Sequence, residues 1–201
     1  MIIMSILRIA VLVAALCGCA TSELTNTWKD PKYHAAPVKK VMVVGISNQA
    51  SVRRTFEDTF AEMLRAKGVE AVPSHTVVPE DGQLAEGRLR AAVEQSGADS
   101  VLITRMVERQ TDAQAVPAPT PVGAYRRTYS SYYSGAWLGH YEPVSVQEFH
   151  YLVTETTLFV LAHAEPVWSG TTRTMESQDI RGATEDFAKP MIAAMKKDGL
   201  I

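Results

Sequence analysis

The order of apolar runs and amphipathic segments in residues 39–107 is the strongest constraint on how this chain can fold. Residues 41–46 read Val-Met-Val-Val-Gly-Ile, a short β-branched run that predicts a buried strand. Further strands are predicted at 69–72 and within 98–107, and the stretch before each of them has the periodicity of a helix. Because the connections are short, this strand–helix–strand–helix–strand order predicts parallel pairing with right-handed crossovers.

The two helices of this segment have recognisable ends and faces. The first should follow Ser47 and Asn48, which are N-cap candidates, and should end at Gly68. Its expected apolar face consists of Val52, Phe56, Phe60, Met63 and Leu64. The i,i+4 ion pairs expected on the other side of this helix are Arg53/Glu57 and Arg54/Asp58. A second helix is expected from Asp81 to about Ser96.

The C-terminal part predicts a hairpin and a last helix. Residues 146–162 are rich in β-forming residues, Glu165-Pro166 marks a turn, and 167–174 reads as the returning strand. The residues expected on the buried face of the last helix are Phe187, Met191 and Met195. Pro190 is expected near the first turns of this helix, because proline is tolerated poorly further inside.

Together these elements predict an α/β fold, with α+β as the alternative. We expect a mixed sheet of about five strands, in the order β-α-β-α-β followed by a β-hairpin and a C-terminal helix, with the helices packed on the sheet. Residues 39–201 are assigned to one domain, since 201 residues suit a single compact unit. The net charge of −2 argues against a nucleic-acid-binding protein.

Residues 111–144 form an insertion rich in tyrosine, proline and glycine that interrupts the regular pattern. Tyrosine and arginine are enriched in the hot spots of protein interfaces, so the insertion predicts a partner-binding segment. The candidate partner-binding residues are Tyr125, Arg126, Arg127, Tyr129, Tyr132, Tyr133, Trp137 and Tyr141. Stacking of the same rings on a glycan, or a surface segment without any partner, are the alternatives.

The sequence contains little that points to catalysis. Ser47 stands at a strand-to-helix junction, but Gln49 occupies the place of the second glycine of a nucleophile elbow. Neither GxGxxG nor GxxxxGK[ST] occurs, and no two of the five histidines have the i,i+4 spacing of a zinc helix. We therefore expect no catalytic residue, no cofactor and no metal site; a hydrolase using Ser47 or His150 is the least favoured alternative.

Residues 1–18 have the pattern of a secretory signal peptide, with Arg8 before the apolar run 9–16. This run is too short to span a membrane, which takes roughly 20 apolar residues. Met1 and Met4 are both possible starts.

The end of this segment resembles the bacterial lipobox, in which Leu, a variable residue and a small residue precede the modified cysteine. The matching residues are Leu16, Cys17, Gly18 and Cys19. The resemblance implies cleavage before Cys19 and attachment of acyl chains to its sulfur and its new amino group. An uncleaved anchor, or cleavage at Ala20, is the alternative. Several acyl chains would hold the protein almost permanently on a membrane.

Residues 19–38 are expected to form a lipidated tether in which Trp28 docks on the domain. In Gram-negative bacteria, Ala20 after the modified cysteine resembles the default for transport to the outer membrane. Cys17 would leave with the signal peptide and Cys19 would be acylated, so no free thiol is expected in the mature chain.

Beyond the lipobox, the segments VMVVGIS (41–47), GADSVL (97–102) and VWSGTT (167–172) look like those of periplasm-facing lipoproteins of Gram-negative bacteria. The α/β order is similar to that of curli-secretion-type and penicillin-binding-protein-activator lipoproteins and of the TolB amino-terminal domain. The resemblance covers roughly residues 16–199. It implies a non-enzymatic module, anchored in the outer membrane and facing the periplasm, that binds an envelope protein partner or the cell wall. A glycan or small-ligand binder using the Tyr-rich insertion is the alternative.

Overall fold

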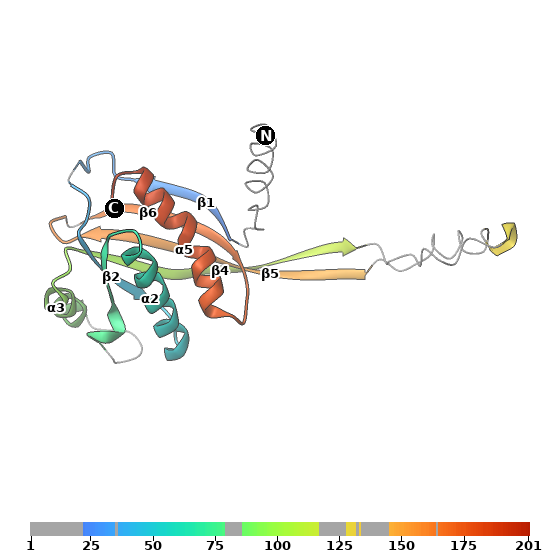
Figure 1. Ribbon diagram of the computed structural model, residues 1–201, viewed down its shortest axis with the longest axis horizontal. Helices are drawn as coiled ribbons and strands as arrows, with labels where there is room; N and C mark the ends of the chain where they lie inside the picture. The colour runs from blue at the N-terminus through green and yellow to red at the C-terminus, as the bar shows by residue number, and fades with distance from the viewer. Residues whose placement is uncertain are drawn as a thin grey trace, which may run out of the picture.

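The computed structural model describes residues 22–34, 36–78, 86–116, 128–131, 133, 145–163 and 165–201. The strands are β1 (Ser22–Lys29), β2 (Lys40–Gly45), β3 (Glu70–Pro73), β4 (Ser100–Val116), β5 (Ser145–Val160) and β6 (Pro166–Met175). The helices are α2 (Ala50–Arg65), α3 (Glu86–Ser96) and α5 (Ile180–Lys197), with a short 3-10 helix, η1 (Ser74–Thr76). Figure 1 shows their arrangement.

The strands form one mixed sheet in the order β1-β6-β5-β4-β2-β3. β2 lies between β3 and β4 and pairs in parallel with both, as the strand–helix alternation predicts. The remaining neighbours are antiparallel, and β5 and β6 form the expected hairpin. The α/β fold is therefore confirmed, with six strands instead of about five.

The additional strand is β1, and it corrects the prediction that residues 19–38 are a tether. β1 pairs with β6 from Ser22↔Thr174 to Lys29↔Trp168 and forms one edge of the sheet. Its side chains are mostly polar and exposed, which suits an edge strand but gives no hydrophobic signal in the sequence. Trp28, which was expected to dock on the domain, is 45% exposed on this strand.

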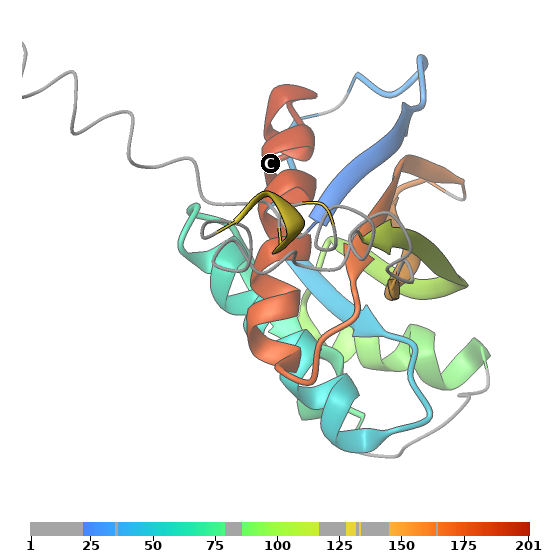
Figure 2. The same cartoon turned by 90° about the vertical axis from the view of Figure 1, so that its right-hand side faces the viewer.

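Alternate residues of the sheet face two hydrophobic cores. Val41 and Val43 of β2 pack in the larger core with α2 and α5, whereas Met42 packs in the smaller one with α3. Figure 2 shows α2 and α5 on one side of the strands and α3 on the other. This arrangement follows from the two-residue period of a strand and from the right-handed crossovers.

Helix α5 corrects the placement of Pro190. The helix starts at Ile180, after an Asp179 side chain that accepts the N–H of Gly182 at 3.0 Å, so Pro190 lies well inside it. An interior proline costs a helix roughly 3 kcal/mol. The helix continues because its apolar face is buried, as predicted; the fully or nearly buried residues are Phe187, Ala188, Met191, Ile192 and Met195.

The predicted i,i+4 pair of Arg53 and Glu57 is confirmed, but it is buried although it lies away from the apolar face of the helix. Glu57 is fully buried and Arg53 is 6% exposed. The Glu57 carboxylate accepts hydrogen bonds from the Gly45 N–H (2.9 Å), the Ser74 hydroxyl (2.7 Å), the His75 N–H (2.8 Å) and Arg53 Nε (3.1 Å). The pair therefore joins the end of β2, the start of α2 and η1, because η1 packs against this side of the helix.

The predicted cap of α2 is also displaced. The helix begins at Ala50 and Gln49 occupies the N-cap position, without a side-chain cap bond. The Ser47 hydroxyl accepts the N–H of Gln49 at 3.1 Å and so stabilises the turn between β2 and α2. The expected start of the second helix at Asp81 lies outside the described residues.

Candidate functional site

The first feature that could serve a function is a long hairpin arm. β4 and β5 pair from Ser100↔Val160 to Val116↔Ser145. However, the pairing of β2 with β4 extends only to Thr104, and the pairing of β6 with β5 extends only to Tyr151. In the part of the chain that the structure describes, residues 111–116 and 145–150 thus form a two-stranded ribbon with no strand on either outer edge. We call this ribbon the arm; Figure 1 shows it projecting beyond the helices.

The arm corrects the start of the predicted insertion. The regular pattern was expected to end before residue 111, but β4 continues to Val116. The described side chains of the arm are exposed except for Phe149, which is half-buried. Since neither face is covered, the arm lacks the apolar alternation that marks a half-buried strand. Only the pairing with β5, remote in sequence, makes 111–116 a strand.

Two sets of side-chain contacts hold the base of the arm to the sheet. On one face, Arg173 of β6 bonds the side chains of Gln110 (3.2 Å) and Asp112 and lies over the ring of Tyr151 at 3.4 Å from its centroid. On the opposite face, Arg109 bonds Glu176 at 2.6 Å. These contacts set the direction in which the arm leaves the body.

The partner-binding residues predicted from sequence are described only in part. The described segment 128–131 lies beyond the far end of the arm (Figure 1), and Tyr129 and Tyr133 are 90% and 64% exposed. The remaining six candidates lie outside the described residues: Tyr125, Arg126, Arg127, Tyr132, Trp137 and Tyr141. The lipobox residues Leu16, Cys17, Gly18 and Cys19 also lie outside them. Their predicted roles stay predictions.

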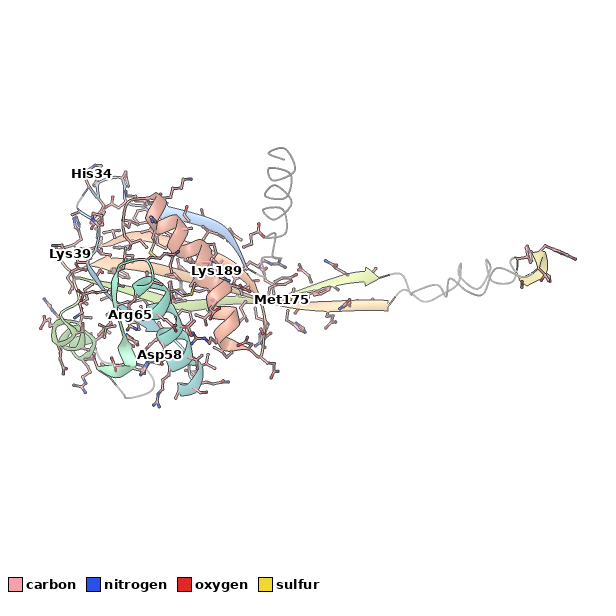
Figure 3. The ribbon with its side chains drawn as sticks, viewed as in Figure 1. His34, Lys39, Asp58, Arg65, Met175 and Lys189 are labelled. Atoms are coloured by element: carbon pink, nitrogen blue, oxygen red, sulfur yellow. The ribbon has the colours of Figure 1, made fainter. Side chains whose placement is uncertain are left out.

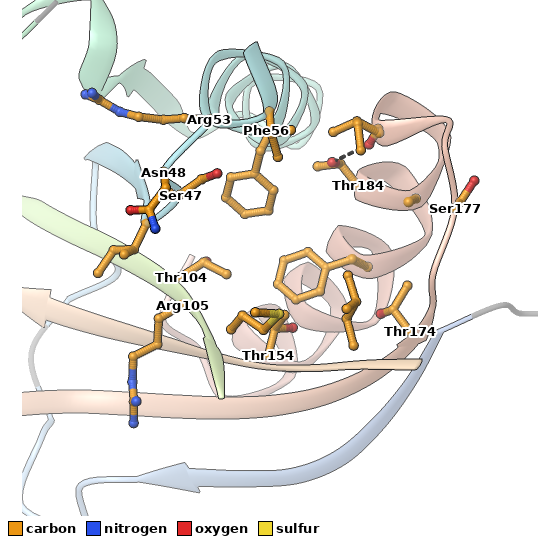
Figure 4. A pocket seen from close by; sticks show the side chains of 18 of the residues that line it. Ser47, Asn48, Arg53, Phe56, Thr104, Arg105, Thr154, Thr174, Ser177 and Thr184 are labelled. Atoms are coloured by element: carbon orange, nitrogen blue, oxygen red, sulfur yellow. Dashed lines mark hydrogen bonds between the residues drawn. The ribbon is translucent and has the colours of Figure 1, made fainter. Parts of the chain in front are cut away.

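The second feature is a cavity of about 440 Å³ at the base of the arm, between the first turns of α2 and α5 and the strands β4, β5 and β6. Its apolar lining residues are Ile46, Val52, Phe56, Met106, Leu152, Met175, Ile180, Ala183 and Phe187. The hydroxyl and amide residues that line it are Ser47, Asn48, Thr104, Thr154, Thr174, Ser177 and Thr184. Figure 4 shows the rings and hydroxyl groups around it, and Figure 3 shows Met175 near the arm.

Three pairs of hydrogen-bonded side-chain hydroxyls, each joining two neighbouring strands, form the floor of the cavity. One hydroxyl of each pair lines the cavity, and the other lies on the neighbouring strand. The pairs and their oxygen–oxygen distances are Ser22–Thr174 (2.6 Å), Thr154–Thr172 (2.8 Å) and Thr104–Thr156 (2.9 Å). Because these hydroxyls bond one another, they do not require a polar ligand to satisfy them.

Two charged residues, Arg53 and Arg105, line the cavity, but their guanidinium groups form ion pairs outside it. Arg53 extends away from the cavity and donates to Glu57, to Ser74 and to the carbonyl of Val78. Arg105 bonds Glu155 at 2.9 Å on the opposite face of the sheet. The aromatic wall is formed by Phe56 and Phe187, whose ring centroids are 5.7 Å apart. The cavity is thus mainly apolar, and the hydroxyl groups on its floor form hydrogen bonds with one another.

The cavity contains Ser47, but the residues proposed for hydrolysis do not form a catalytic arrangement with it. The Ser47 hydroxyl bonds the backbone of Gln49, and His150 bonds Thr111 on the arm at 3.1 Å without lining the cavity. In the described residues, no group of three histidine, cysteine, aspartate or glutamate side chains could hold a metal ion. Over the same residues, no helix is long and apolar enough to cross a membrane.

Sequence reasoning missed the cavity because its lining comes from four separate stretches of the chain. These stretches are 45–56, 104–106, 152–154 and 174–187. The available signal was weak: Gly45 ends a buried strand, and a Cβ there would lie 2.8 Å from the Phe56 ring. Glycine therefore permits Phe56 to pack over the end of β2, beside the cavity.

No protein-family model matches the chain, and no curated protein matches it in sequence. Among solved structures, the PelC dodecamer from Paraburkholderia phytofirmans is similar at a TM-score of 0.46 and 11% identity, over 86% of this chain and 95% of that chain. A PDZ domain protein from Parabacteroides distasonis is similar at a TM-score of 0.35 and 11% identity, over 79% of this chain and 32% of that one. Likeness at this level carries no functional argument.

Proposed function

We propose that this protein is a bacterial envelope lipoprotein, anchored in the outer membrane through Cys19 and facing the periplasm, that binds a protein partner without catalysing a reaction. The observation that carries the proposal is the arm, whose outer edges pair with no described strand. An isolated two-stranded ribbon is only marginally stable in water, and open strand edges readily accept another strand. A partner strand added to the arm would supply the missing hydrogen bonds.

The geometry of the arm suits such a role. Six paired residues on each strand extend about 20 Å at the usual rise of a strand. Tyr129 and Tyr133 follow one strand of this ribbon and precede the other in the sequence, and both are exposed, so their rings can bury area against a partner and still hydrogen bond. The arm thus offers backbone pairing along its edges and aromatic anchors beyond its end.

The lipobox supports the membrane anchor, and the fold limits the distance between anchor and domain. Ser22 begins β1 only three residues after Cys19. Three residues of extended chain span at most about 10 Å, so the folded domain would stay next to the membrane surface. Ser22 bonds Thr174 near the end of β6, so this attachment lies on the side of the domain from which the arm leaves.

Crosslinking in intact cells tests the proposal. One variant replaces residues 117–144 by Asn-Gly and keeps the arm, and a second replaces 113–148 by Asn-Gly and removes most of it. We expect the second variant to lose the main crosslinked partner while urea unfolding of the body remains cooperative, because the described side chains that it removes are mostly exposed and lie outside both cores.

Comparison with the first variant distinguishes binding by the Tyr-rich insertion from binding by the edges of the arm. Partner loss in both variants would assign binding to the Tyr-rich insertion, whereas loss only in the second would assign it to the edges of the arm. An unchanged set of partners in both variants would overturn the proposed function.

A further inference from the structure

We propose that the cavity at the base of the arm binds one acyl chain of the lipid carried by Cys19 of the same molecule. The inference rests on the proposed lipidation and adds a site that holds part of the anchor. It follows from the chemistry of the cavity lining and from the place where the chain enters the domain.

The lining selects an uncharged, apolar ligand. Phe56, Phe187 and Leu152 form apolar walls, and the hydroxyls of the floor already bond one another. The charged groups of Arg53 and Arg105 are paired outside the cavity. Most of the lining is apolar, so a sugar or a phosphate would leave most of its polar groups without partners here, which is costly, whereas a hydrocarbon chain requires none.

The position of the anchor selects which hydrocarbon chain this is. Ser22 Oγ lies 2.6 Å from Thr174 Oγ1, and Thr174 lines the cavity. Cys19 is three residues earlier and so within about 10 Å of Ser22 along the chain. An acyl chain tethered at this distance has a high effective concentration at the cavity, which favours its binding there over that of a free lipid.

The rim of the cavity is apolar and open to solvent. Ile46, Met106 and Met175 line the cavity and yet are 62%, 57% and 37% exposed. Apolar side chains that are exposed together around a cavity are typical of a ligand-binding site. The volume of about 440 Å³ lies within the range of small-molecule sites, roughly 300–1,000 Å³.

The test uses the full-length protein made in cells that incorporate a fatty acid carrying a photoreactive diazirine. After purification in detergent and illumination, mass spectrometry locates the acyl label and its crosslinks. We expect label on Cys19 and intramolecular crosslinks to the peptides that contain Met106, Leu152 and Phe187. The variant Ala183→Phe fills the cavity and should lower these crosslinks at least tenfold. Ala193→Phe, an exposed position of the same helix, is the matched control and should not change them.

Cys19→Ala completes the test and does not depend on whether the cavity variant folds. If its cavity peptides are still crosslinked, the occupant is a separate lipid and the proposal is overturned. Labelled Cys19 without crosslinks to the cavity overturns this inference alone. Absence of label from Cys19 overturns the anchor and, with it, the inference.

Discussion

The body of the domain and the arm are built from the same two strands, β4 and β5, but different forces hold them. In the body, Val101 and Leu102 of β4 point into opposite cores and are at most 8% exposed, with strands on both sides. In the arm, the described side chains of residues 111–115 are all exposed. Burial stabilises the first segment, whereas the second depends on cross-strand pairing and on the contacts at its base.

This difference supports separate roles for the two regions, the body in stability and the arm in the proposed binding. A region that buries its side chains resists change and positions its neighbours, whereas a region with open edges can gain stability from a partner. Removing a buried carboxylate from the body should therefore cost more stability than removing a contact at the joint between body and arm.

The largest effect is expected from Glu57→Ala in the body. The change should lower the free energy of unfolding by about 3–5 kcal/mol, because it removes a fully buried carboxylate that accepts four hydrogen bonds and leaves their buried donors without this acceptor. Urea denaturation followed by circular dichroism measures the loss. The control is Glu94→Ala: Glu94 pairs with Arg90 at the same i,i+4 spacing, but the two side chains are 65% and 80% exposed.

The control should cost no more than about 0.5 kcal/mol, as is usual for exposed helix pairs. If Glu57→Ala and Glu94→Ala lose equal stability, burial does not make the Arg53–Glu57 pair more stabilising than the Arg90–Glu94 pair. The conclusion that burial stabilises the body would then be wrong.

A smaller effect is expected at the joint between body and arm. Arg173→Ala removes the contacts to Asp112 and to the Tyr151 ring and should cost about 1 kcal/mol. More specifically, amide hydrogen exchange within 111–116 and 145–150 should become faster while the core strands stay protected. Arg181→Ala, which breaks an exposed pair with Glu62, is the control and should leave exchange in the arm unchanged. Equal acceleration in both variants would contradict the role of Arg173.

The smallest effect concerns the pH dependence of the body. Burial, and secondarily the negative charge of Asp99, raise the pKa of Tyr33 above its ordinary value of 10.0. The folded protein thus keeps a proton that the unfolded chain releases, so the stabilising contribution is present below about pH 10 and is lost as the pH rises through the folded pKa.

Tyr33→Phe should therefore lose less stability than the wild type between about pH 9 and 11 in otherwise identical denaturation experiments. Tyr129→Phe serves as the control, since its ring is 90% exposed. Parallel curves for the wild type and Tyr33→Phe would exclude Tyr33 as the cause.

Much of the body could be predicted from local patterns. The run 41–46, the apolar face of the last helix and the β5–β6 hairpin are encoded by neighbouring residues, because the periods of strands and helices are short. Gly97, predicted to end a helix, has φ of +67°, a conformation that glycine adopts without strain. These features needed no knowledge of distant contacts.

The errors share one physical origin, which is contact between remote segments. Ser22–Lys29 became a strand because β6 offered an open edge. Arg53 and Glu57 have the same i,i+4 spacing in the sequence as an exposed pair, and only the packing of η1 buried them. Pro190 lies deep in α5 because burial of the surrounding apolar face outweighs one lost backbone hydrogen bond.

The sequence by itself determined the α/β order of the elements, the positions of the apolar residues on their faces and the pattern at 16–19 that resembles a lipobox, since these depend on short-range periodicity and composition. Only the tertiary structure decided that Arg53 and Glu57 of α2 are also buried, that residues 111–116 extend β4 into an arm, and that four stretches enclose one cavity. Those outcomes depend on which remote surfaces meet, and a surface becomes core, edge or cavity only when its neighbour is in place.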